Sequence, residues 1–428
     1  MSAPIRFMSG ARNYNPADLR IDGERLWQAL MAMARIGATP AGGVKRLALT
    51  DEDRAGRALL IDWARAAGCA VSVDAIGNVF LRRPGRDNGL APVLTGSHLD
   101  SQPSGGKFDG AYGVIAGLEV LRCLADAGVV TECAIELVCW TNEEGTRFSP
   151  AMMGSGVFAG KIPLVQALAE PDSARTTTLA AELERIGYAG AGAVGGRPIH
   201  AYFEAHIEQG PILEAAGKTI GVVQGIQGIR WFTAHIRGAD AHAGTTPMTA
   251  RRDALLAAAR LIEAINRIAL DHAPGGRGTV GRLVVSPNSP NVVPGSVALS
   301  VDLRHPDAIA LASMAGEVEA TFDGLIAAAG LDGSIEQTWY SPPTAFDPAC
   351  IEAVRRGAEA IAASSMAITS GAGHDAKYLA DICPAAMVFV PCKGGVSHNE
   401  SEDARPEHLA AGCQVLLHAI MAKADEPD

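Results

Sequence analysis

The chain has 428 residues, of which 48% are hydrophobic and 19% are charged, a balance typical of folded proteins rather than disordered ones. A chain of this length exceeds what a single hydrophobic core usually supports, so we expect two domains. The formal net charge of −11 argues against nucleic acid or an anionic membrane surface as the main partner.

The first part of the chain alternates patterns of helices and of buried strands. Helices are predicted over residues 26–36, 50–67 and 112–127, the second with Thr50 as its N-cap. Short apolar runs predict strands at 71–73, 79–81, 93–95 and 135–140. Continuous apolar strands separated by helices favour an α/β fold with a largely parallel sheet covered on both faces. Ligands gather beyond the carboxyl ends of such strands.

After Gly210 the pattern changes to the order β-α-β-β-α-β. The predicted elements are strand 229–237, helix 247–268, strands 279–285 and 297–304, helix 307–329 and strand 334–340. This order is that of the split βαβ unit, which we interpret as a small domain inserted in a larger one. We therefore assign residues 1–215 and 337–428 to the larger domain and residues 216–336 to the inserted domain. A further strand at 386–390 leads into a Gly-rich loop.

Side chains that bind metals stand where predicted strands run into loops. They are His98, Asp109, Glu143, Glu144, His206 and His398. The segments that contain them are T-G-S-H-L-D-S-Q-P-S-G-G-K-F-D-G at 95–110, W-T-N-E-E-G-T-R-F at 140–148, H-I-E-Q-G at 206–210 and G-G-V-S-H-N-E at 394–400. Three histidines and two carboxylates with a spare glutamate are what a two-metal hydrolase needs, because the ligands hold the ions and the extra carboxylate moves protons.

The spacing suggests how these groups work together. Asp100 lies two residues after His98, and we expect its carboxylate to accept a hydrogen bond from the imidazole and fix its tautomer. Two glycines at 105 and 106 permit a tight loop that brings Asp109 back toward His98, where a carboxylate can bridge two cations. Glu143 and Glu144 are adjacent, so they should point in different directions, one to coordinate and the other to act on water.

These motifs resemble the amidase branch of the M20 metallopeptidase family, which comprises N-carbamoyl-L-amino acid hydrolases, β-ureidopropionase and allantoate amidohydrolase. The resemblance runs from about residue 20 to residue 420. It implies a zinc-peptidase-like catalytic domain with a mostly parallel sheet. It also implies that the inserted domain is a ferredoxin-like lid through which the enzyme forms a homodimer.

The resemblance further implies two divalent metal ions per subunit with Asp109 as the bridge. His98 and His206 would bind one ion, and Glu144 and His398 the other. Glu143 would be the general acid/base. Imidazole and carboxylate ligands without a thiolate suit Zn, Mn, Co or Ni.

Substrate-binding residues are also implied by the resemblance. In G-A-D-A-H-A-G-T-T-P, His242 would reach the partner subunit's active site and help bind the developing oxyanion. Asn291 in N-V-V-P-G and Arg304 in D-L-R-H-P resemble the amide and guanidinium that grip the substrate carboxylate. Gln209 resembles the glutamine that faces the ureido group. The glycine-rich S-G-A-G-H-D segment at 370–375 adds His374 as a further candidate.

The expected reaction is cleavage of the ureido C–N bond of N-carbamoyl-L-amino acids to amino acid, ammonia and carbon dioxide. Allantoate amidohydrolase, or another ureide amidohydrolase, is the alternative, but the M-M-G-S-G-V-F-A-G run at 152–160 favours the carbamoylases. Gln209, Asn291 and Arg304 together speak against an aminopeptidase or a deacylase. A non-catalytic scaffold is expected to lose Glu143 or a ligand, and none is missing.

The remaining features bear on location. No stretch approaches the ~18 uninterrupted apolar residues of a membrane helix, and residues 1–15 lack a signal-peptide pattern. The eight cysteines have no paired spacing, which is typical of reduced thiols. We therefore expect a cytoplasmic enzyme that binds a small ureido substrate and neither nucleic acid nor membrane.

Overall fold

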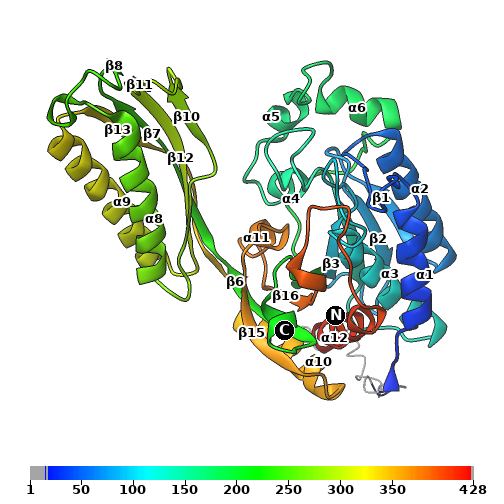
Figure 1. The fold of residues 1–428 in the computed structure, drawn as a ribbon. Helices are drawn as coiled ribbons and strands as arrows, with labels where there is room; N and C mark the ends of the chain where they lie inside the picture. Colours follow the sequence, from blue (N-terminus) through cyan, green and yellow to red (C-terminus); the bar gives the residue numbers. More distant parts are fainter. Residues whose placement is uncertain (1–14, 16–17, 426–428) are drawn as a thin grey trace, which may run out of the picture. The chain divides into compact units, whose positions relative to one another are not determined.

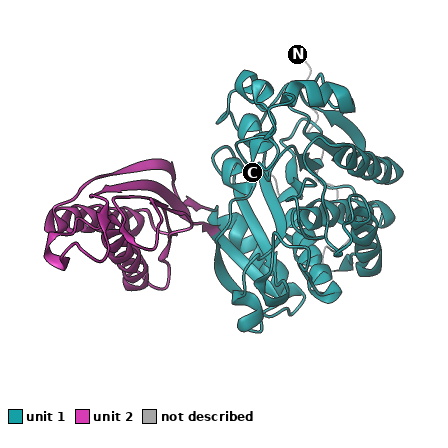
Figure 2. Cartoon of the chain, turned by 45° about the horizontal axis from the view of Figure 1, so that its top comes forward, with its two compact units in different colours: residues 1–224, 346–428 teal, residues 225–345 magenta. Residues whose placement is uncertain are grey.

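The computed structural model describes residue 15 and residues 18–425, which form two compact units. Unit 2 is the continuous segment Gly225–Ala345, and unit 1 contains the described residues before and after it (Figure 2). Unit 2 begins and ends later than the inserted segment assigned from the sequence. The reason is that strand β6 (Ile220–Ile226) pairs with strand β16 (Ala385–Val390) and so belongs to the sheet of unit 1.

Unit 1 contains most of a nine-stranded sheet (Figure 1). The strand order is β1-β2-β4-β3-β5-β16-β6-β14, with β15 paired to β6; β14 and the last two residues of β6 fall within unit 2. The four central strands run parallel, which confirms the predicted α/β architecture. They are β4 (Ile135–Trp140), β3 (Val93–His98), β5 (Ala201–Ile207) and β16. Antiparallel strands extend the sheet at both edges; these are β1 (Ala70–Val73), β2 (Val79–Arg83), β6 and β14 (Thr344–Ala345). Strand β15 spans Ser365–Ser370.

The first two strands are the antiparallel edge of this largely parallel sheet. Strands β1 and β2 form an antiparallel pair, and β2 is also antiparallel to β4. Only residues 74–78 separate β1 from β2. A parallel pair needs a crossover of a dozen or more residues, so a connection this short permits only a hairpin.

Helices cover both faces of the sheet. The long ones are α1 (Gly23–Ala34), α2 (Asp51–Ala66), α3 (Ala111–Asp126), α10 (Pro348–Ala360) and α12 (Pro406–Ala424). The short ones are α4 (Met153–Phe158), α5 (Leu164–Ala169), α6 (Leu179–Ile186), α7 (Ile212–Ala215) and α11 (Ala376–Leu379). Helix α2 begins as predicted, because the Thr50 side chain accepts a hydrogen bond from the backbone N–H of Asp53.

Strand β5 shows how the sheet separates an apolar face from a polar one. Phe203 and Ala205 lie in the main hydrophobic core, and α3 and α12 pack against this strand. Glu204 and His206 alternate with them and so point to the other face. There the Glu204 carboxylate accepts a hydrogen bond from the backbone N–H of Ala376, the first residue of α11. Polar groups are therefore buried on one face of the central strands, beside the apolar core.

Unit 2 has its own hydrophobic core beneath an antiparallel sheet of the order β10-β12-β7-β13, with β9 paired to β12. The strands are β7 (Gly228–Arg237), β9 (Arg277–Thr279), β10 (Leu283–Ser286), β12 (Ser296–His305) and β13 (Asp332–Ser341), and the helices are α8 (Ala254–Asp271) and α9 (Ala308–Ala329). A short ribbon pairs β8 (Ala241–His242) with β11 (Val292–Val293). The chain order is the predicted β-α-β-β-α-β, with one strand in two pieces.

Two predicted boundaries in unit 2 were wrong. The first helix starts at Ala254 and not at residue 247, because Asp253 caps it by accepting a hydrogen bond from Leu256 N. A short 3-10 turn, Met248–Ala250, precedes it. The strand predicted at 279–285 is divided into β9 and β10, which both pair with β12. Across residues 18–425, no helix is long and apolar enough to cross a bilayer.

Candidate metal centre

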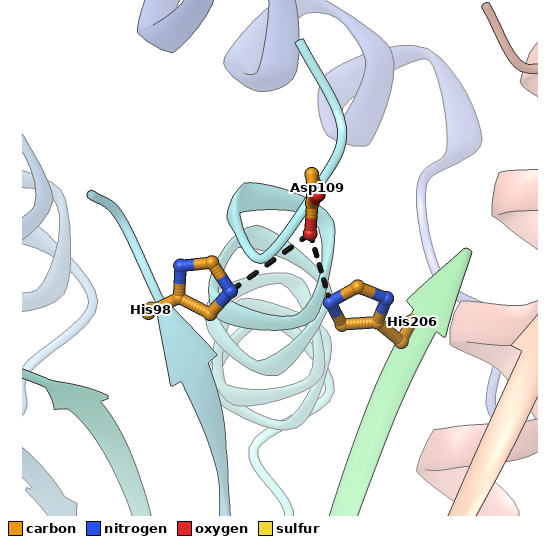
Figure 3. A group of neighbouring side chains, drawn as sticks. All are labelled: His98, Asp109 and His206. Carbon is orange, nitrogen blue, oxygen red and sulfur yellow. Dashed lines mark ion pairs between the residues drawn. The ribbon is translucent and has the colours of Figure 1, made fainter. Parts of the chain in front are cut away.

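Three buried side chains meet beyond the carboxyl ends of two parallel strands. His98 is the last residue of β3, His206 is near the end of β5, and Asp109 lies in the loop that leads into α3. Asp109 Oδ1 is 3.9 Å from His98 Nε2 and 3.3 Å from His206 Nε2 (Figure 3). Their ligand atoms all lie within 4.8 Å of one another. The ends of the neighbouring parallel strands β3 and β5 and the Asp109 loop therefore form a three-ligand group.

A second group of three shares the same carboxylate. Asp109 Oδ2 is 3.2 Å from His398 Nε2, which is in turn 3.5 Å from Glu144 Oε2. These ligand atoms also lie within 4.8 Å of one another. The two oxygens of Asp109 thus face opposite groups, Oδ1 toward His98 and His206 and Oδ2 toward His398. The side chain of His398 is 51% exposed, so this group is open to solvent.

Backbone carbonyls orient the two buried imidazoles. His98 Nδ1 is 2.9 Å from Asp100 O, and His206 Nδ1 is 2.9 Å from Ile207 O. An N–H donated from Nδ1 leaves the Nε2 lone pair directed at Asp109. The backbone N–H of Gly110 donates to His206 Nε2 at 3.2 Å, which fits the same tautomer. Both rings are therefore oriented with Nε2 toward Asp109, the direction in which a metal would bind.

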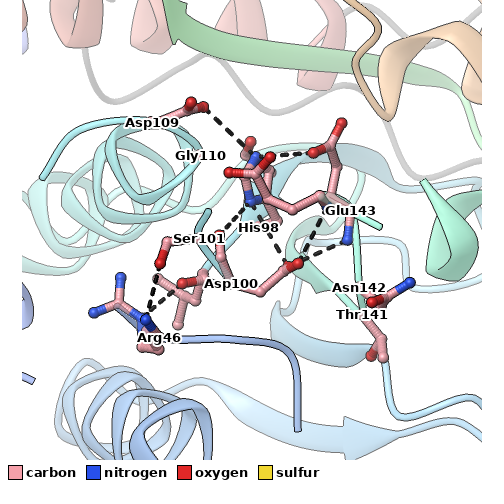
Figure 4. Close-up of polar contacts among 12 residues, drawn as sticks. Arg46, His98, Asp100, Ser101, Asp109, Gly110, Thr141, Asn142 and Glu143 are labelled. Carbon is pink, nitrogen blue, oxygen red and sulfur yellow. Dashed lines mark hydrogen bonds and ion pairs between the residues drawn. The ribbon is translucent and has the colours of Figure 1, made fainter. Parts of the chain in front are cut away.

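The role predicted for the Asp100 carboxylate was wrong. Its Oδ1 is 3.7 Å from His98 Nδ1, too far for a hydrogen bond. The carboxylate instead accepts from the backbone N–H group of Glu143, at 3.2 Å (Figure 4). It also accepts from the backbone N–H group of Glu144, at 3.1 Å. Asp100 therefore holds the loop after β4 in place, while its own carbonyl orients His98.

The adjacent glutamates face different histidines. Glu143 Oε2 is 3.4 Å from His98 Nε2. Glu144 Oε2 accepts a hydrogen bond from Gln102 Nε2 at 2.6 Å and lies beside His398. Burial raises the pKa of Glu143 well above its ordinary value, and the nearby carboxylates raise it further. Burial and Asp109 likewise raise the pKa of Glu144, to about 8.

The electrostatics of the site suit cations. Burial lowers the pKa of His98 to about 4, so its imidazole is neutral at pH 7 and able to bind a metal. Burial also lowers the pKa of His206, but the hydrogen bond to Asp109 and the negative charge of that residue together outweigh it and raise that pKa to about 8, so a bound cation would displace a proton from this ring. Burial raises the pKa of Asp100 to about 7 and that of Glu402 to about 7. Several buried carboxylates repel one another here, and a positive charge between them would relieve that repulsion. The donors are nitrogen and oxygen without thiolate, a set that fits Zn, Mn, Co or Ni.

Known proteins are similar in sequence to this chain over nearly its whole length. The model of the family described as peptidase family M20/M25/M40 matches residues 94–422. The N-carbamoyl-L-amino-acid amidohydrolase of Rhizobium meliloti is 48% identical, covering 95% of this chain and 97% of its own. The chain belongs to peptidase family M20/M25/M40.

Two further relatives place the chain within the amidase branch of this M20 family, as its motifs predict. A crystal structure of an amidase of the hydantoinase/carbamoylase family from Burkholderia multivorans has 57% identity and a TM-score of 0.94, covering 96% of this chain and all of that one. The allantoate amidohydrolase of Bacillus subtilis is less similar, with 34% identity over 91% of this chain and 94% of its own length.

Gln209, a candidate substrate-binding residue, lies directly beside the Asp109 carboxylate that the two ligand groups share. Its Nε2 donates hydrogen bonds to Asp109 Oδ2 at 2.9 Å and to Ser397 Oγ at 3.2 Å. Its Oε1 is buried and accepts no hydrogen bond from the described residues. Gln209 and His398 both have positive φ, 58° and 54°, which is uncommon for residues other than glycine and is often found in functional loops.

Three candidates lie in unit 2. His242 in β8 is paired with Val292 in β11, so it is next to Asn291, whose carbonyl accepts a hydrogen bond from Ala243 N at 2.9 Å. Backbone N–H groups of Gly244 and Thr245 donate to His242 Nδ1. Arg304 lies in β12. Unit 2 thus brings His242 and Asn291 together on one ribbon.

Several residues of the site were not singled out from the sequence. Ser397 and Glu402 contact the Asp109 loop, and Gln102 binds Glu144. Gln102 and Ser397 lie within the motifs at 95–110 and 394–400, which is the signal that could have found them, whereas Glu402 lies just after the second motif. His374, named as a further candidate, packs against His206 with ring centroids 4.5 Å apart.

Proposed function

We propose that this protein is a metal-dependent amidohydrolase that cleaves the ureido C–N bond of N-carbamoyl-L-amino acids. The products would be the amino acid, ammonia and carbon dioxide. The observation that carries this proposal is the near full-length relationship to N-carbamoyl-L-amino-acid amidohydrolases, at 48% identity for the Rhizobium meliloti protein. The two ligand groups that share Asp109 supply the chemistry that such a reaction needs.

The proposed metal site holds two divalent ions, Zn, Mn, Co or Ni, on either side of Asp109. His98 and His206 would bind one ion, and Glu144 and His398 the other. The opposite directions of the two Asp109 oxygens support this assignment. Such ions, when bound, lower the pKa of water toward ~7 and polarise the carbonyl of the substrate.

Glu143 is the proposed general acid/base. It accepts a proton from the attacking water as the new C–O bond forms, and it returns that proton to the departing nitrogen as the C–N bond breaks. Its carboxylate is buried, and Oε2 lies 3.4 Å from His98 Nε2. Glu143 is thus beside the ligands without being a member of a three-ligand group. Burial raises the pKa of Glu143, which favours the protonated form that donates to the departing nitrogen, whereas bound cations would lower that pKa and favour the carboxylate that accepts the proton of water.

Substrate recognition is proposed for residues of both units. The unpartnered Gln209 Oε1 would accept a hydrogen bond from a ureido N–H. Arg304 and Asn291 would bind the substrate carboxylate. The Arg304 guanidinium is seen to bind a carboxylate through two nitrogens, because Nε donates to Asp302 Oδ1 at 3.0 Å and Nη2 donates to Asp302 Oδ2 at 2.9 Å. His242 would stabilise the oxyanion, a role typically worth about 3–4 kcal/mol for one donor.

The proposed assembly is a homodimer formed through unit 2, which would act as the lid and supply His242 to the partner's active site. In support, unit 2 exposes large apolar side chains: Trp231 is 43% exposed, Trp339 40% and Tyr340 41%. Analytical ultracentrifugation of the whole protein tests this assembly. A protein that stays monomeric at micromolar concentration would contradict it.

We also propose a cytoplasmic location. All eight cysteines are free and buried, as expected of a chain that stays in a reducing compartment. Cell fractionation checks this directly.

Substrate class is tested by measuring ammonia release. The panel contains N-carbamoyl-L-amino acids, N-carbamoyl-β-alanine and allantoate, with the protein loaded in turn with each metal. The highest kcat/KM is expected for an N-carbamoyl-L-amino acid. Allantoate is the second candidate because the Bacillus subtilis allantoate amidohydrolase is 34% identical. A clear preference for allantoate would replace the proposed substrate while leaving the metal chemistry intact.

A further inference from the structure

A buried carboxylate connects the two loops that carry Asp109 and His398. Glu402 is 1% exposed and follows the His398 loop. Its Oε1 accepts hydrogen bonds from two consecutive backbone N–H groups of the other loop, those of Phe108 at 2.8 Å and Asp109 at 3.1 Å. Its Oε2 is 3.0 Å from the Ser397 hydroxyl. One side chain thus binds both loops at once.

Ser397 extends the connection to the shared ligand itself. Its hydroxyl is 3.0 Å from Asp109 Oδ2, the oxygen that faces His398. The single hydroxyl proton can be donated to Asp109 or to Glu402, and Gln209 Nε2 donates to the Ser397 oxygen at 3.2 Å. The backbone and the carboxylate of Asp109 are therefore both tied to the loop that carries His398.

The loop packs directly on the Glu402 carboxylate. A Cβ atom added to Gly106 would lie 2.0 Å from the carboxyl carbon of Glu402 and 2.0 Å from its Oε1. No side chain fits at that distance, so residue 106 must be a glycine for the carboxylate to reach the backbone N–H groups of Phe108 and Asp109. This close approach leaves Glu402 little freedom to move.

His398 has greater need of such support than the other two histidines. His98 and His206 each have a backbone carbonyl 2.9 Å from Nδ1. Within residues 18–425, His398 Nδ1 has no such hydrogen bond, and its side chain is 51% exposed. Its position therefore depends on the loop that carries it.

We propose that Glu402 and Ser397 form a latch that fixes the Asp109 loop against the His398 loop and sets the distance between Asp109 Oδ2 and His398 Nε2. Glu402 is then a positioning residue mainly for the second ion: Asp109 serves both ions, but the first ion keeps His98 and His206, which are oriented by their own carbonyls. This inference rests on the two-ion site of the proposed function, but not on the identity of the substrate.

The test measures metal binding without substrate. Metal-free protein is titrated with Co²⁺ and followed by calorimetry and by the visible absorption of bound cobalt. The variants Glu402→Ala and Ser397→Ala break the latch. Glu402→Gln keeps it, because the amide oxygen still accepts from both backbone N–H groups and the amide N–H can donate to Ser397. Glu400→Ala is the matched control, since this glutamate of the same loop makes no hydrogen bond or ion pair with the described residues.

The wild type, Glu402→Gln and Glu400→Ala should bind two ions with similar affinity. Glu402→Ala and Ser397→Ala should keep the first ion and bind the second about 10–100-fold more weakly, the usual effect of losing a residue that orients a ligand. Excess metal should restore their turnover. Ser397→Ala removes a single oxygen, so it keeps the test decisive if Glu402→Ala does not fold.

Three results would overturn the latch. The first is unchanged affinity for the second ion in Ser397→Ala. The second is an equal loss of both ions, which indicates general damage to the fold. The third is a Glu402→Gln variant that binds the second ion as weakly as Glu402→Ala, which indicates that the charge of Glu402 and not its hydrogen bonds supports metal binding. A wild type that binds a single ion would instead contradict the two-ion site itself, and the latch with it.

Discussion

At the residue scale, Glu143 and Glu144 are chemically identical neighbours that the fold directs toward different histidines. Glu144 lies in a three-ligand group with Asp109 and His398, whereas Glu143 lies beside His98 outside both groups. Substitution of Glu143 by Ala should leave the metal content near that of the wild type while kcat falls by roughly 10²–10⁴-fold, the usual contribution of a general acid/base. Metal analysis by mass spectrometry and ammonia release check the two parts.

Glu144→Ala is the matched comparison, because it should lose metal instead. If Glu143→Ala retains near-normal turnover, Glu143 is not the general acid/base. If it loses metal as Glu144→Ala does, Glu143 is a ligand.

Glu182 provides a pH dependence away from the metal residues. Burial alone would raise its pKa, but hydrogen bonds from Arg185 and Arg147 lower the pKa below its ordinary value of 4.5. A lowered pKa means that the stabilisation is present above 4.5 and is lost as the pH falls through the folded-state pKa. Glu182→Gln should therefore lower Tm at pH 7, and its Tm should approach that of the wild type as the pH falls below 4.5. Calorimetry from pH 7 to below pH 4.5 measures the Tm of the wild type and of the variant. If the difference between the two Tm values grows toward acid pH, the pKa of Glu182 is not lowered by folding.

At the scale of elements, α3 approaches the sheet closely through a glycine. A Cβ atom at Gly113 would be 2.4 Å from Ala205 O and 2.7 Å from Ser97 Cβ, so no side chain fits between α3 and strands β3 and β5. These strands carry His98 and His206, and α3 begins two residues after Asp109. The spacing of helix and sheet thus sets the spacing of the first ligand group.

Gly113→Ala should destabilise the protein by about 1–3 kcal/mol, the usual cost of overpacking, and should also weaken metal binding. Denaturant unfolding and Co²⁺ titration measure these effects. The control is Gly316→Ala in α9, where nothing lies within 4 Å of the added Cβ. That change should be neutral or stabilising by up to about 1 kcal/mol, since alanine favours helix. If Gly113→Ala and Gly316→Ala change stability and metal affinity equally, the close packing of α3 on the sheet does not cause the losses seen in Gly113→Ala.

At the scale of the whole molecule, the proposed dimer predicts that two inactive variants complement each other. Mixing His242→Ala with Glu143→Ala subunits would give heterodimers in which one active site has both Glu143 and the His242 of the partner subunit. With random exchange about half of the dimers are mixed, so activity should recover to about a quarter of the wild-type value per site. Ammonia release after subunit exchange, verified by native mass spectrometry, measures it. If no activity returns, His242 acts in its own subunit or is structural.

Much of the architecture was predictable because its signals are local. The central strands β3, β4 and β16 and the helix order of unit 2 follow from apolar periodicity. Errors arose where a cap or a break in a strand decided the outcome: Asp253 delays the start of α8, and the strand predicted at 279–285 is divided into β9 and β10. The candidate ligands were visible because each belongs to a distinctive motif at the end of a strand.

By itself, the sequence determined the kinds of element, the set of nitrogen and oxygen donors and the family, since periodicity and motifs are properties of short segments. Only the tertiary structure decided which atoms meet. In the folded protein the Asp100 carboxylate accepts a hydrogen bond from the backbone of Glu143 and not from His98. Glu402 likewise accepts a hydrogen bond from the backbone N–H of Phe108, 294 positions away in the sequence. A hydrogen bond forms wherever packing brings a donor within about 3 Å of an acceptor, and that distance depends on the whole fold rather than on any one segment.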